Sequence, residues 1–514
     1  MKLRPNQLLI ILVILKLALP YILQSFSYEP HRDEFLYLEQ GHHMAWGYME
    51  VPPVLSVFAW LTHAFGDGMF WIKLWPSLFG AATFIVAGRI VLSLGGKGFA
   101  LLLLFLPFIF GVYLRLFFLF QPNSPEVFFW TMIAFSIISF IQTGKNKWLY
   151  IFGLSIGFGL LSKYSVAFFL VSVLIGLLLS KYRVIFFNKN FWYSMLLGFA
   201  IFLPNIFWQY ERNFPVIHHM EELQETQLQF ISPFVFLKDQ LLMNLPCFFI
   251  WIAGLLYISF SNKEKRFRFL GWTYVVVIIL FLVSHGKNYY TLGIYPVLFA
   301  FGAYRLEQLT MQKRKSLRYA FILFPVILGI LMLPIALPVF PPKQLASFYE
   351  KMGTKKTGAL KWEDLKDHPL PQDFSDMLGW KTIAEKTARL YNSLSPEEKN
   401  KTIIKCDNYG LCGALNFYGK HMGLPEAYCY NGSFLLWMPD TFNITNVITI
   451  GENFPDTTRN IVKNFENVSL KDELKDSFAR EDGTEIILWY HCNASVLSKF
   501  LEDEVRQRKK KFTR

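Results

Sequence analysis

Two adjacent carboxylates follow the first hydrophobic segment of the chain. The apolar run from Leu8 to Phe26 ends shortly before Asp33 and Glu34. A charge within the hydrocarbon of a bilayer is costly, so acids this close to a helix end usually face water, a cavity or a site. Carboxylates are common general acids and bases when they line a site. The alternative is a solvated loop at the membrane interface.

Basic and aromatic residues recur at the ends of later apolar runs. Lys287 precedes Tyr289 and Tyr290 directly after one run, and Lys163 with Tyr164 interrupts another. An unpaired lysine within an apolar stretch is costly, so a phosphate or an acid is expected as its partner. The alternatives are a lysine that snorkels to the interface and tyrosines that belong to an aromatic belt.

The composition is that of a polytopic membrane protein. Of the 514 residues, 53% are hydrophobic and 18% are aromatic, and the mean hydropathy is +0.31. Repeated apolar runs of about 20 residues are typical of membrane spans. The net charge of +13 is attributed to cytoplasmic loops rather than to nucleic acid, for which there is no motif. The first apolar run lacks a small-residue cleavage site, which predicts a retained helix.

The apolar runs predict about eleven transmembrane helices. The expected ranges are 7–27, 70–94, 98–120, 124–143, 148–162, 164–180, 191–210, 240–260, 269–284, 291–305 and 319–339. The run Val54–Phe65 is too short for a span, and we expect it to form a re-entrant or interfacial helix.

The loop charges predict the orientation of this protein in the membrane. Eighteen Lys and Arg residues fall on one set of alternate connections and seven on the other. Excess positive charge marks the cytoplasmic side, which places the N-terminus in the cytoplasm. An odd number of spans then places the residues after 340 outside. The prediction is a multi-pass protein of the inner (cytoplasmic) membrane whose outer loops meet on one face.

Residues 341–514 are rich in charged residues interspersed with polar and apolar ones, and they contain no apolar run long enough to cross a bilayer. Trp380–Leu394 has helical spacing, while Lys401–Cys406 and Thr484–Tyr490 are typical of strands. We therefore predict two domains, a transmembrane domain over 1–340 and a soluble extracytoplasmic α/β domain over 341–514.

The cysteines permit disulfides but do not give their pairing. Four lie in the C-terminal region and one, Cys247, lies in a predicted span; the four are Cys406, Cys412, Cys429 and Cys492. An even number in an oxidising compartment allows bridges, and the spacing is not that of a metal site.

The histidines do not predict a metal site. The pairs His42-His43 and His218-His219 are adjacent in sequence, so in regular structure their rings point apart, and no carboxylate at fixed spacing accompanies them or His285. We assign no metal ligand and no cofactor, and a divalent metal ion is kept as the alternative.

Several motifs together resemble a known family. They are Asp33-Glu34 with Gly47-Tyr48 and Pro52-Pro53, QPNSPEVFFW (Gln121–Trp130), LLSKYS (Leu160–Ser165), HGKNYYTLGIYP (His285–Pro296) and NYGLCGALNFYGKHMGLPEA (Asn408–Ala427). The chain resembles the PMT-like (GT-C) membrane glycosyltransferases, which include protein O-mannosyltransferases, lipid A aminoarabinose transferases and the bacterial proteins described as dolichyl-phosphate-mannose-protein mannosyltransferase-like. It departs from many members by Asn123, where they carry Asp, and by Glu50-Val51 before the prolines, where they carry an acid and His.

The resemblance implies transfer of a sugar from a polyprenyl-phosphate carrier to an extracytoplasmic acceptor, which is a protein, lipid A or another glycan. Asp33 is then expected to be the general base, and Glu34 either takes part or orients its neighbour. Lys287 is the expected phosphate ligand. The predicted substrate-binding residues are Lys287, Tyr289, Tyr290, Lys163, Tyr164, Glu126, Arg115, His285 and Tyr48.

The alternative function is a transporter or flippase for a lipid-linked saccharide. Many transporters contain an internal repeat of their spans, and this sequence shows none. The sequence leaves open which sugar and which acceptor are used. For the C-terminal region we expect a part in acceptor recognition.

Overall fold

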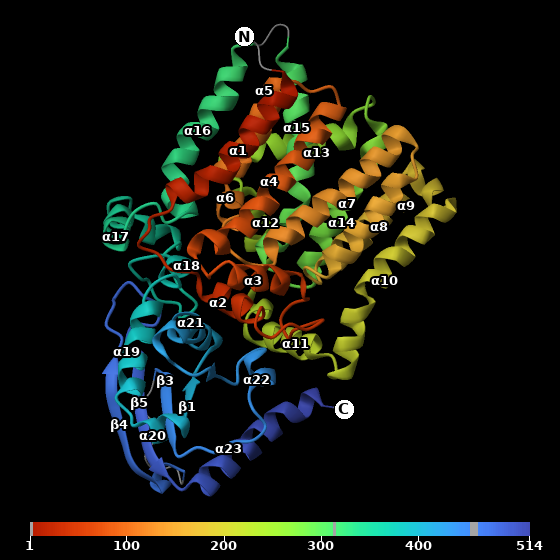
Figure 1. Cartoon of the computed structure of the whole chain (residues 1–514). Helices are drawn as coiled ribbons and strands as arrows, with labels where there is room; N and C mark the ends of the chain where they lie inside the picture. Colours follow the sequence, from red (N-terminus) through yellow and green to blue (C-terminus); the bar gives the residue numbers. More distant parts are fainter. Residues whose placement is uncertain (1–3, 312–314, 453–460, 514) are drawn as a thin grey trace.

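A computed structural model of the chain describes residues 4–311, 315–452 and 461–513. Its helices form a bundle, and the C-terminal region (residues 341–514) packs a β-sheet and several helices against one end of that bundle (Figure 1). The short helices α2 (Arg32–Glu39) and α3 (Val54–Ala64) lie at the junction between the two parts.

Long apolar segments dictate most helices of the bundle, because a backbone in lipid must satisfy its own hydrogen bonds. These helices are α1 (Pro5–Leu23), α4 (Met69–Ser93), α5 (Gly98–Ile109), α7 (Asn123–Thr143), α8 (Lys147–Leu160), α9 (Val166–Leu178), α10 (Lys189–Glu211), α12 (Pro233–Leu242), α13 (Phe248–Phe260), α14 (Arg268–Val283), α15 (Tyr295–Leu309) and α16 (Leu317–Ala336). Two further helices are the five-residue α6 (Val112–Leu116) and the polar, mostly exposed α11 (Pro215–Thr226).

Within the described residues, six helices are long and apolar enough to cross a membrane, and up to eight if each of two bent pairs is one span. The six are α1, α4, α7, α10, α16 and the stretch Lys265–Val283 that contains α14. The bent pairs are α9 with the 3-10 helix Lys181–Phe187 and α12 with Leu245–Phe260, which bend by 110° and 64°.

The predicted count of about eleven spans is not confirmed. The range 98–120 divides into α5 and α6, because Pro107 cannot donate to the helix and the helical pattern ends before Gly111. Helix α5 has 12 residues and α8 has 14. At 1.5 Å per residue such helices are about 20 Å long, which is shorter than a hydrocarbon core of about 30 Å.

The C-terminal region contains a five-stranded sheet in the order β2-β1-β3-β5-β4. β1 is parallel to β2 and β3, and β5 is antiparallel to β3 and β4. The elements are α17 (Pro342–Lys351), α18 (Gln372–Ser375), α19 (Trp380–Asn392), α20 (Pro396–Asn400), β1 (Thr402–Cys406), α21 (Tyr409–Gly419), β2 (Ala427–Tyr428), α22 (Phe434–Trp437), β3 (Asn446–Gly451), β4 (Phe465–Glu473), β5 (Glu485–Cys492) and α23 (Ala494–Lys509).

The sequence predicted three of these C-terminal elements. The helix expected over Trp380–Leu394 is α19, and the two expected strands are β1 and β5. All five cysteines lie in described ranges, where they are buried free thiols rather than disulfides.

Candidate functional site

Helix α2 carries the two carboxylates and begins at a capping box built by His31. The His31 Nδ1 atom accepts the backbone N–H of Asp33 at 3.2 Å, and the His31 N–H donates to Glu34 Oε2 at 2.7 Å. Each contact satisfies an N–H group that has no partner within the first turn of a helix. The cap therefore fixes the point at which α2 begins and holds the backbone of Asp33.

The Glu34 carboxylate is fully buried in an ion pair. Its two oxygens accept from Lys73 Nζ of α4, each at 2.6 Å, and Oε1 also accepts from the backbone N–H of Phe120 at 2.5 Å. With the His31 N–H, these donors occupy both oxygens. The arrangement favours the alternative in which Glu34 anchors and orients α2 rather than reacting.

The Asp33 carboxylate is only partly buried and lines a cavity. Its Oδ1 accepts from the Tyr409 hydroxyl at 2.7 Å, and its Oδ2 accepts from Gln121 Nε2 at 3.2 Å. Both donors are neutral, so within the described residues Asp33 forms no ion pair. Such a carboxylate can still accept a proton from a bound hydroxyl group.

The cavity has a volume of about 1040 Å³, which is at the upper end of the range for small-molecule sites. It collects side chains from segments far apart in the sequence. Its polar lining includes Asp33, Tyr37, Glu50, Gln121, Asn123, Lys163, Tyr164, His219, Glu221, Glu222, His285, Lys287, Tyr289, Tyr290, Tyr409 and Asn431.

Lys163 lies on the cavity wall with its charge already neutralised. Its Nζ donates to Glu126 Oε2 at 2.8 Å and to Asn123 Oδ1 at 2.7 Å. The ammonium also lies 4.5 Å from the ring centre of Tyr290 and 5.5 Å from that of Tyr289. The acid partner expected for this lysine is thus Glu126, and Asn123 contacts the same ammonium.

Lys287 lies on the cavity wall without such a partner. No hydrogen bond or ion pair joins its ammonium to any residue among those described in the structure. Burial lowers the pKa of Lys287 from its usual value, and the charge of Asp33 opposes that shift. A partly desolvated cation with no counter-ion is a suitable contact for an anion.

A polar network holds the segment that carries Lys287. Asn288 Nδ2 donates to Asp239 Oδ2 of α12 at 2.8 Å, and the hydroxyls of Thr291 and Tyr295 donate to Gln240 Oε1 at 2.6 and 2.8 Å. His285, next to this segment, has left-handed backbone with a φ of 52°. Its buried Nδ1 has no hydrogen-bond partner among the described residues.

Two further cavity residues are fixed by their neighbours. The Tyr164 hydroxyl donates to Asn205 Oδ1 at 3.2 Å and accepts from Gln209 Nε2 at 2.8 Å. Glu50 contacts the C-terminal region, since its Oε1 and Oε2 accept from the N–H and hydroxyl of Ser433, each at 2.6 Å.

Three predicted substrate-binding residues, Glu126, Tyr48 and Arg115, do not line the cavity; Glu126 contacts it only through its ion pair with Lys163. The Tyr48 hydroxyl is buried among backbone groups and donates to the carbonyl oxygens of Gln40 and His43 at 3.0 and 3.1 Å. Arg115 forms an ion pair with Asp373 of α18. Tyr48 and Arg115 therefore support the junction between bundle and C-terminal region.

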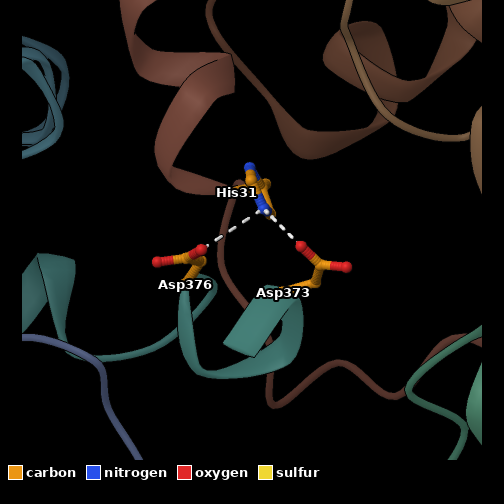
Figure 2. Close-up of side chains that lie close together, drawn as sticks. All are labelled: His31, Asp373 and Asp376. Carbon is orange, nitrogen blue, oxygen red and sulfur yellow. Dashed lines mark ion pairs between the residues drawn. The ribbon is translucent and has the colours of Figure 1, made fainter. Parts of the chain in front are cut away.

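Figure 2 shows His31 between Asp373 and Asp376, an arrangement that could suggest a metal site. The His31 Nε2 atom lies 3.9 Å from Asp373 Oδ1 and 3.7 Å from Asp376 Oδ2. Because Nδ1 accepts the N–H of Asp33, a neutral His31 carries its proton on Nε2, which then has no lone pair for a metal. The cap thus disfavours metal binding here, and the acids are paired with Arg115 and Arg480.

A second His and acid group joins the loop after α2 to the C-terminal region. His43 Nε2 lies 3.4 Å from Glu39 and 3.0 Å from Glu426. Burial disfavours the charged imidazole, but contacts with Glu39 and Glu426 raise the pKa of His43 to about 9. The imidazolium is therefore charged at neutral pH, and the group is an ion-pair bridge between the two parts of the molecule.

Sequence reasoning missed three of the residues around Asp33. Gln121 and Tyr409 donate to its carboxylate, and Glu50 lines the same cavity. Gln121 and Tyr409 belong to motifs that the sequence already singled out, so their positions in those motifs were a usable signal. That a tyrosine from the C-terminal region reaches Asp33 depends on how the two parts pack, which no local pattern contains.

Comparison with known proteins places the chain among membrane proteins of similar architecture. Residues 50–208 match the family model described as dolichyl-phosphate-mannose-protein mannosyltransferase. A search of curated proteins finds no match.

Two solved structures of ArnT from Cupriavidus metallidurans match almost the whole chain. The structure bound to undecaprenyl phosphate has a TM-score of 0.60 and 12% identity, covering 94% of this chain and 97% of that chain. The apo structure has a TM-score of 0.55 and 13% identity, covering 95% and 98%. The oligosaccharyltransferase from Archaeoglobus fulgidus, in complex with Zn and sulfate, has a TM-score of 0.48 and 14% identity, covering 86% and 67%.

These matches confirm the resemblance to the PMT-like GT-C proteins that the sequence predicted. The chain is a multi-pass membrane protein with the fold of ArnT.

Proposed function

We propose that this protein is an integral membrane glycosyltransferase that moves a sugar from a polyprenyl-phosphate donor to an extracytoplasmic acceptor. The observation that supports this proposal is one cavity that holds both a carboxylate with no ion-pair partner and a cation with no ion-pair partner among the described residues. Asp33 supplies the carboxylate and Lys287 the cation. Sugar transfer from a phosphate needs both charges in one site.

The proposed reaction assigns a role to each charge. The Asp33 carboxylate takes the proton of the acceptor hydroxyl while the oxygen of that hydroxyl forms a bond with the anomeric carbon of the sugar. The bond between that carbon and the phosphate oxygen breaks, and the polyprenyl phosphate leaves with the bonding electron pair. Lys287 meets the charge that develops on the departing phosphate.

The aromatic residues beside Lys287 suit the remainder of the donor. Tyr289 and Tyr290 line the cavity with Lys163, whose charge Glu126 neutralises. In this proposal their hydroxyls donate to the phosphate or their rings flank the first prenyl units. The ArnT structure that matches this chain was solved with undecaprenyl phosphate, which supports a carrier of this kind.

The proposed orientation places the cavity and the C-terminal region outside the cytoplasm. It rests on the excess of Lys and Arg on alternate loops, which indicates a cytoplasmic N-terminus. We propose the inner (cytoplasmic) membrane as the location, with a transmembrane domain over 1–340 and an extracytoplasmic domain over 341–514.

The test is transfer by the purified protein in nanodiscs. Radiolabelled polyprenyl-phosphate sugars are supplied one at a time with a membrane extract as acceptor, and labelled product is measured. The proposal predicts transfer from at least one donor. No transfer from any donor, combined with movement of a lipid-linked sugar across sealed vesicles that hold the protein, contradicts it and indicates a flippase.

A further inference from the structure

Helix α2 belongs to two hydrophobic cores at once. Phe35 and Leu36 are buried in the core of the C-terminal region, where the Phe35 ring lies 5.6 Å from that of Trp380. Leu38, on another side of the same helix, is buried with Phe120 of the bundle. The helix that carries Asp33 is therefore shared by both parts of the molecule.

Helix α21 of the C-terminal region packs directly on α2 (Figure 1). Two glycines allow the close approach. A Cβ atom on Gly410 would lie 2.6 Å from Arg32 Cγ, and one on Gly413 would lie 2.7 Å from Phe35 Cβ. Real Cβ atoms are essentially never this close to other heavy atoms, so a larger side chain at Gly410 would displace Arg32. At Gly413, where a Cβ would also lie 3.0 Å from the Phe35 backbone, a larger side chain would push the two helices apart.

Tyr409 is the first residue of α21, and this packing brings its hydroxyl to Asp33. The hydroxyl donates to Asp33 Oδ1 at 2.7 Å, and the ring lies 4.9 Å from the guanidinium carbon of Arg32. Burial, together with the charge of Asp33, raises the pKa of Tyr409 well above its usual range. The phenol therefore stays protonated and serves as a donor to the carboxylate.

We propose that the C-terminal region completes the active site, with Tyr409 as a positioning residue for Asp33. This inference rests on the proposed function. The short bond from Tyr409 fixes Oδ1, whereas Oδ2 receives only the longer bond of 3.2 Å from Gln121. Oδ2 is then the oxygen that accepts the proton of the acceptor hydroxyl.

The role follows from what a general base requires. A carboxylate must present one oxygen to the reacting hydroxyl in a fixed direction, and small displacements lower the rate steeply. Asp33 lies near the start of a helix of eight residues and lines the cavity. A donor from a second rigid element restricts its rotation. Tyr409 supplies that donor from the C-terminal region.

The experiment compares Tyr409→Phe with wild type, using the donor and acceptor that support wild-type transfer. We expect kcat to fall about tenfold or more, the usual effect of losing a hydrogen bond to a charged group. The KM for acceptor and the Kd for undecaprenyl phosphate should stay within about twofold of wild type, because a positioning residue acts on the reacting step.

Tyr490→Phe is the matched control. Its hydroxyl donates to Glu398 Oε1 at 2.6 Å within the same C-terminal region and does not line the cavity. The control loses the same kind of bond but outside the cavity, so we expect its kcat to equal that of wild type. A second variant, Gly413→Ala, keeps the Tyr409 hydroxyl but separates α21 from Phe35, and we expect a lower kcat from it as well.

The outcomes separate this inference from the proposed function. Wild-type kcat in Tyr409→Phe, with transfer by wild type intact, overturns the role of Tyr409 alone. A parallel loss of kcat and of donor binding makes Tyr409 a donor ligand and also overturns it. Should Tyr409→Phe fail to fold, normal kcat in Gly413→Ala has the same consequence. No transfer by wild type from any donor contradicts the proposed function itself.

Discussion

Replacement of Lys287 by methionine tests whether Lys287, and not the already paired Lys163, binds the phosphate of the donor. Lys163 already pairs with Glu126 at 2.8 Å, whereas Lys287 has no ion pair or hydrogen bond to any described residue. If Lys287 binds the phosphate, Lys287→Met removes a charge-assisted contact and leaves no protein acid unpaired. We therefore expect a loss of affinity for the donor phosphate without a large loss of stability.

The size of the effect follows from the kind of contact. Hydrogen bonds to charged groups contribute about 1.5 to 3 kcal/mol, and each 1.4 kcal/mol corresponds to about a tenfold change in Kd. Lys287→Met should raise the Kd for undecaprenyl phosphate about 10- to 150-fold. Lys287→Arg keeps a cation at this position and should retain most of the affinity.

The assay titrates undecaprenyl phosphate into the protein purified in detergent and follows binding by microscale thermophoresis. Lys351→Met, an exposed lysine of α17, is the control for loss of one positive charge and should bind as wild type. Thermal unfolding of each variant is recorded in parallel. A Kd for Lys287→Met within about twofold of wild type would refute the assignment of Lys287 to the phosphate.

Three further predictions concern Lys287, Glu34 and His31. Burial lowers the pKa of Lys287 below its usual value, and only the charged form attracts phosphate, so the affinity of wild type for undecaprenyl phosphate should fall as pH rises through that lowered pKa. Lys287→Arg should show a flatter pH profile of Kd. Equal profiles for the two proteins would count against this explanation. Glu34→Gln leaves Lys73 buried and without its acid, so thermal unfolding in detergent should show that the free energy of unfolding falls by about 3 to 5 kcal/mol. The double variant Glu34→Gln with Lys73→Met should recover part of this stability. Wild-type stability of the single variant would contradict the ion-pair account. His31→Ala removes the cap on α2 and should lower the free energy of unfolding by about 0.5 to 2 kcal/mol. His31→Asn can still accept the N–H of Asp33 and should retain most of this stability. Equal unfolding temperatures of the two variants would contradict the role of His31 as a cap.

The membrane architecture followed from composition, but the number of spans did not. Apolar runs show that a segment is helical, whereas its length depends on breaks such as that after Pro107, where one expected span becomes α5 and α6. In the C-terminal region, β1 and β5 followed from their apolar runs. The two-residue strand β2 has too few residues to give a local pattern.

The predicted site likewise contains residues that a local sequence pattern indicates and contacts that depend on tertiary packing. Asp33, Lys163 and Lys287 were found because charge at the end of an apolar run is costly and indicates a partner or a site. The contacts of Glu34 with Lys73 and of Asp33 with Tyr409 were not predicted, because each joins residues that meet only through tertiary packing. Tyr48 and Arg115 belong to polar sequence segments of the same kind, but the fold directs them to the junction instead of the cavity.

The most direct test of the central claim is single-turnover sugar transfer by Asp33→Asn, which keeps the size and the oxygen contact of the side chain but cannot take a proton as a carboxylate does. The purified variant is loaded with the donor that supports wild-type transfer, and the rate of product formation is followed after acceptor is added. We predict that transfer falls by at least about a hundredfold, within the usual contribution of a general base, with an unchanged Kd for the donor. Transfer at the wild-type rate would contradict Asp33 as the general base.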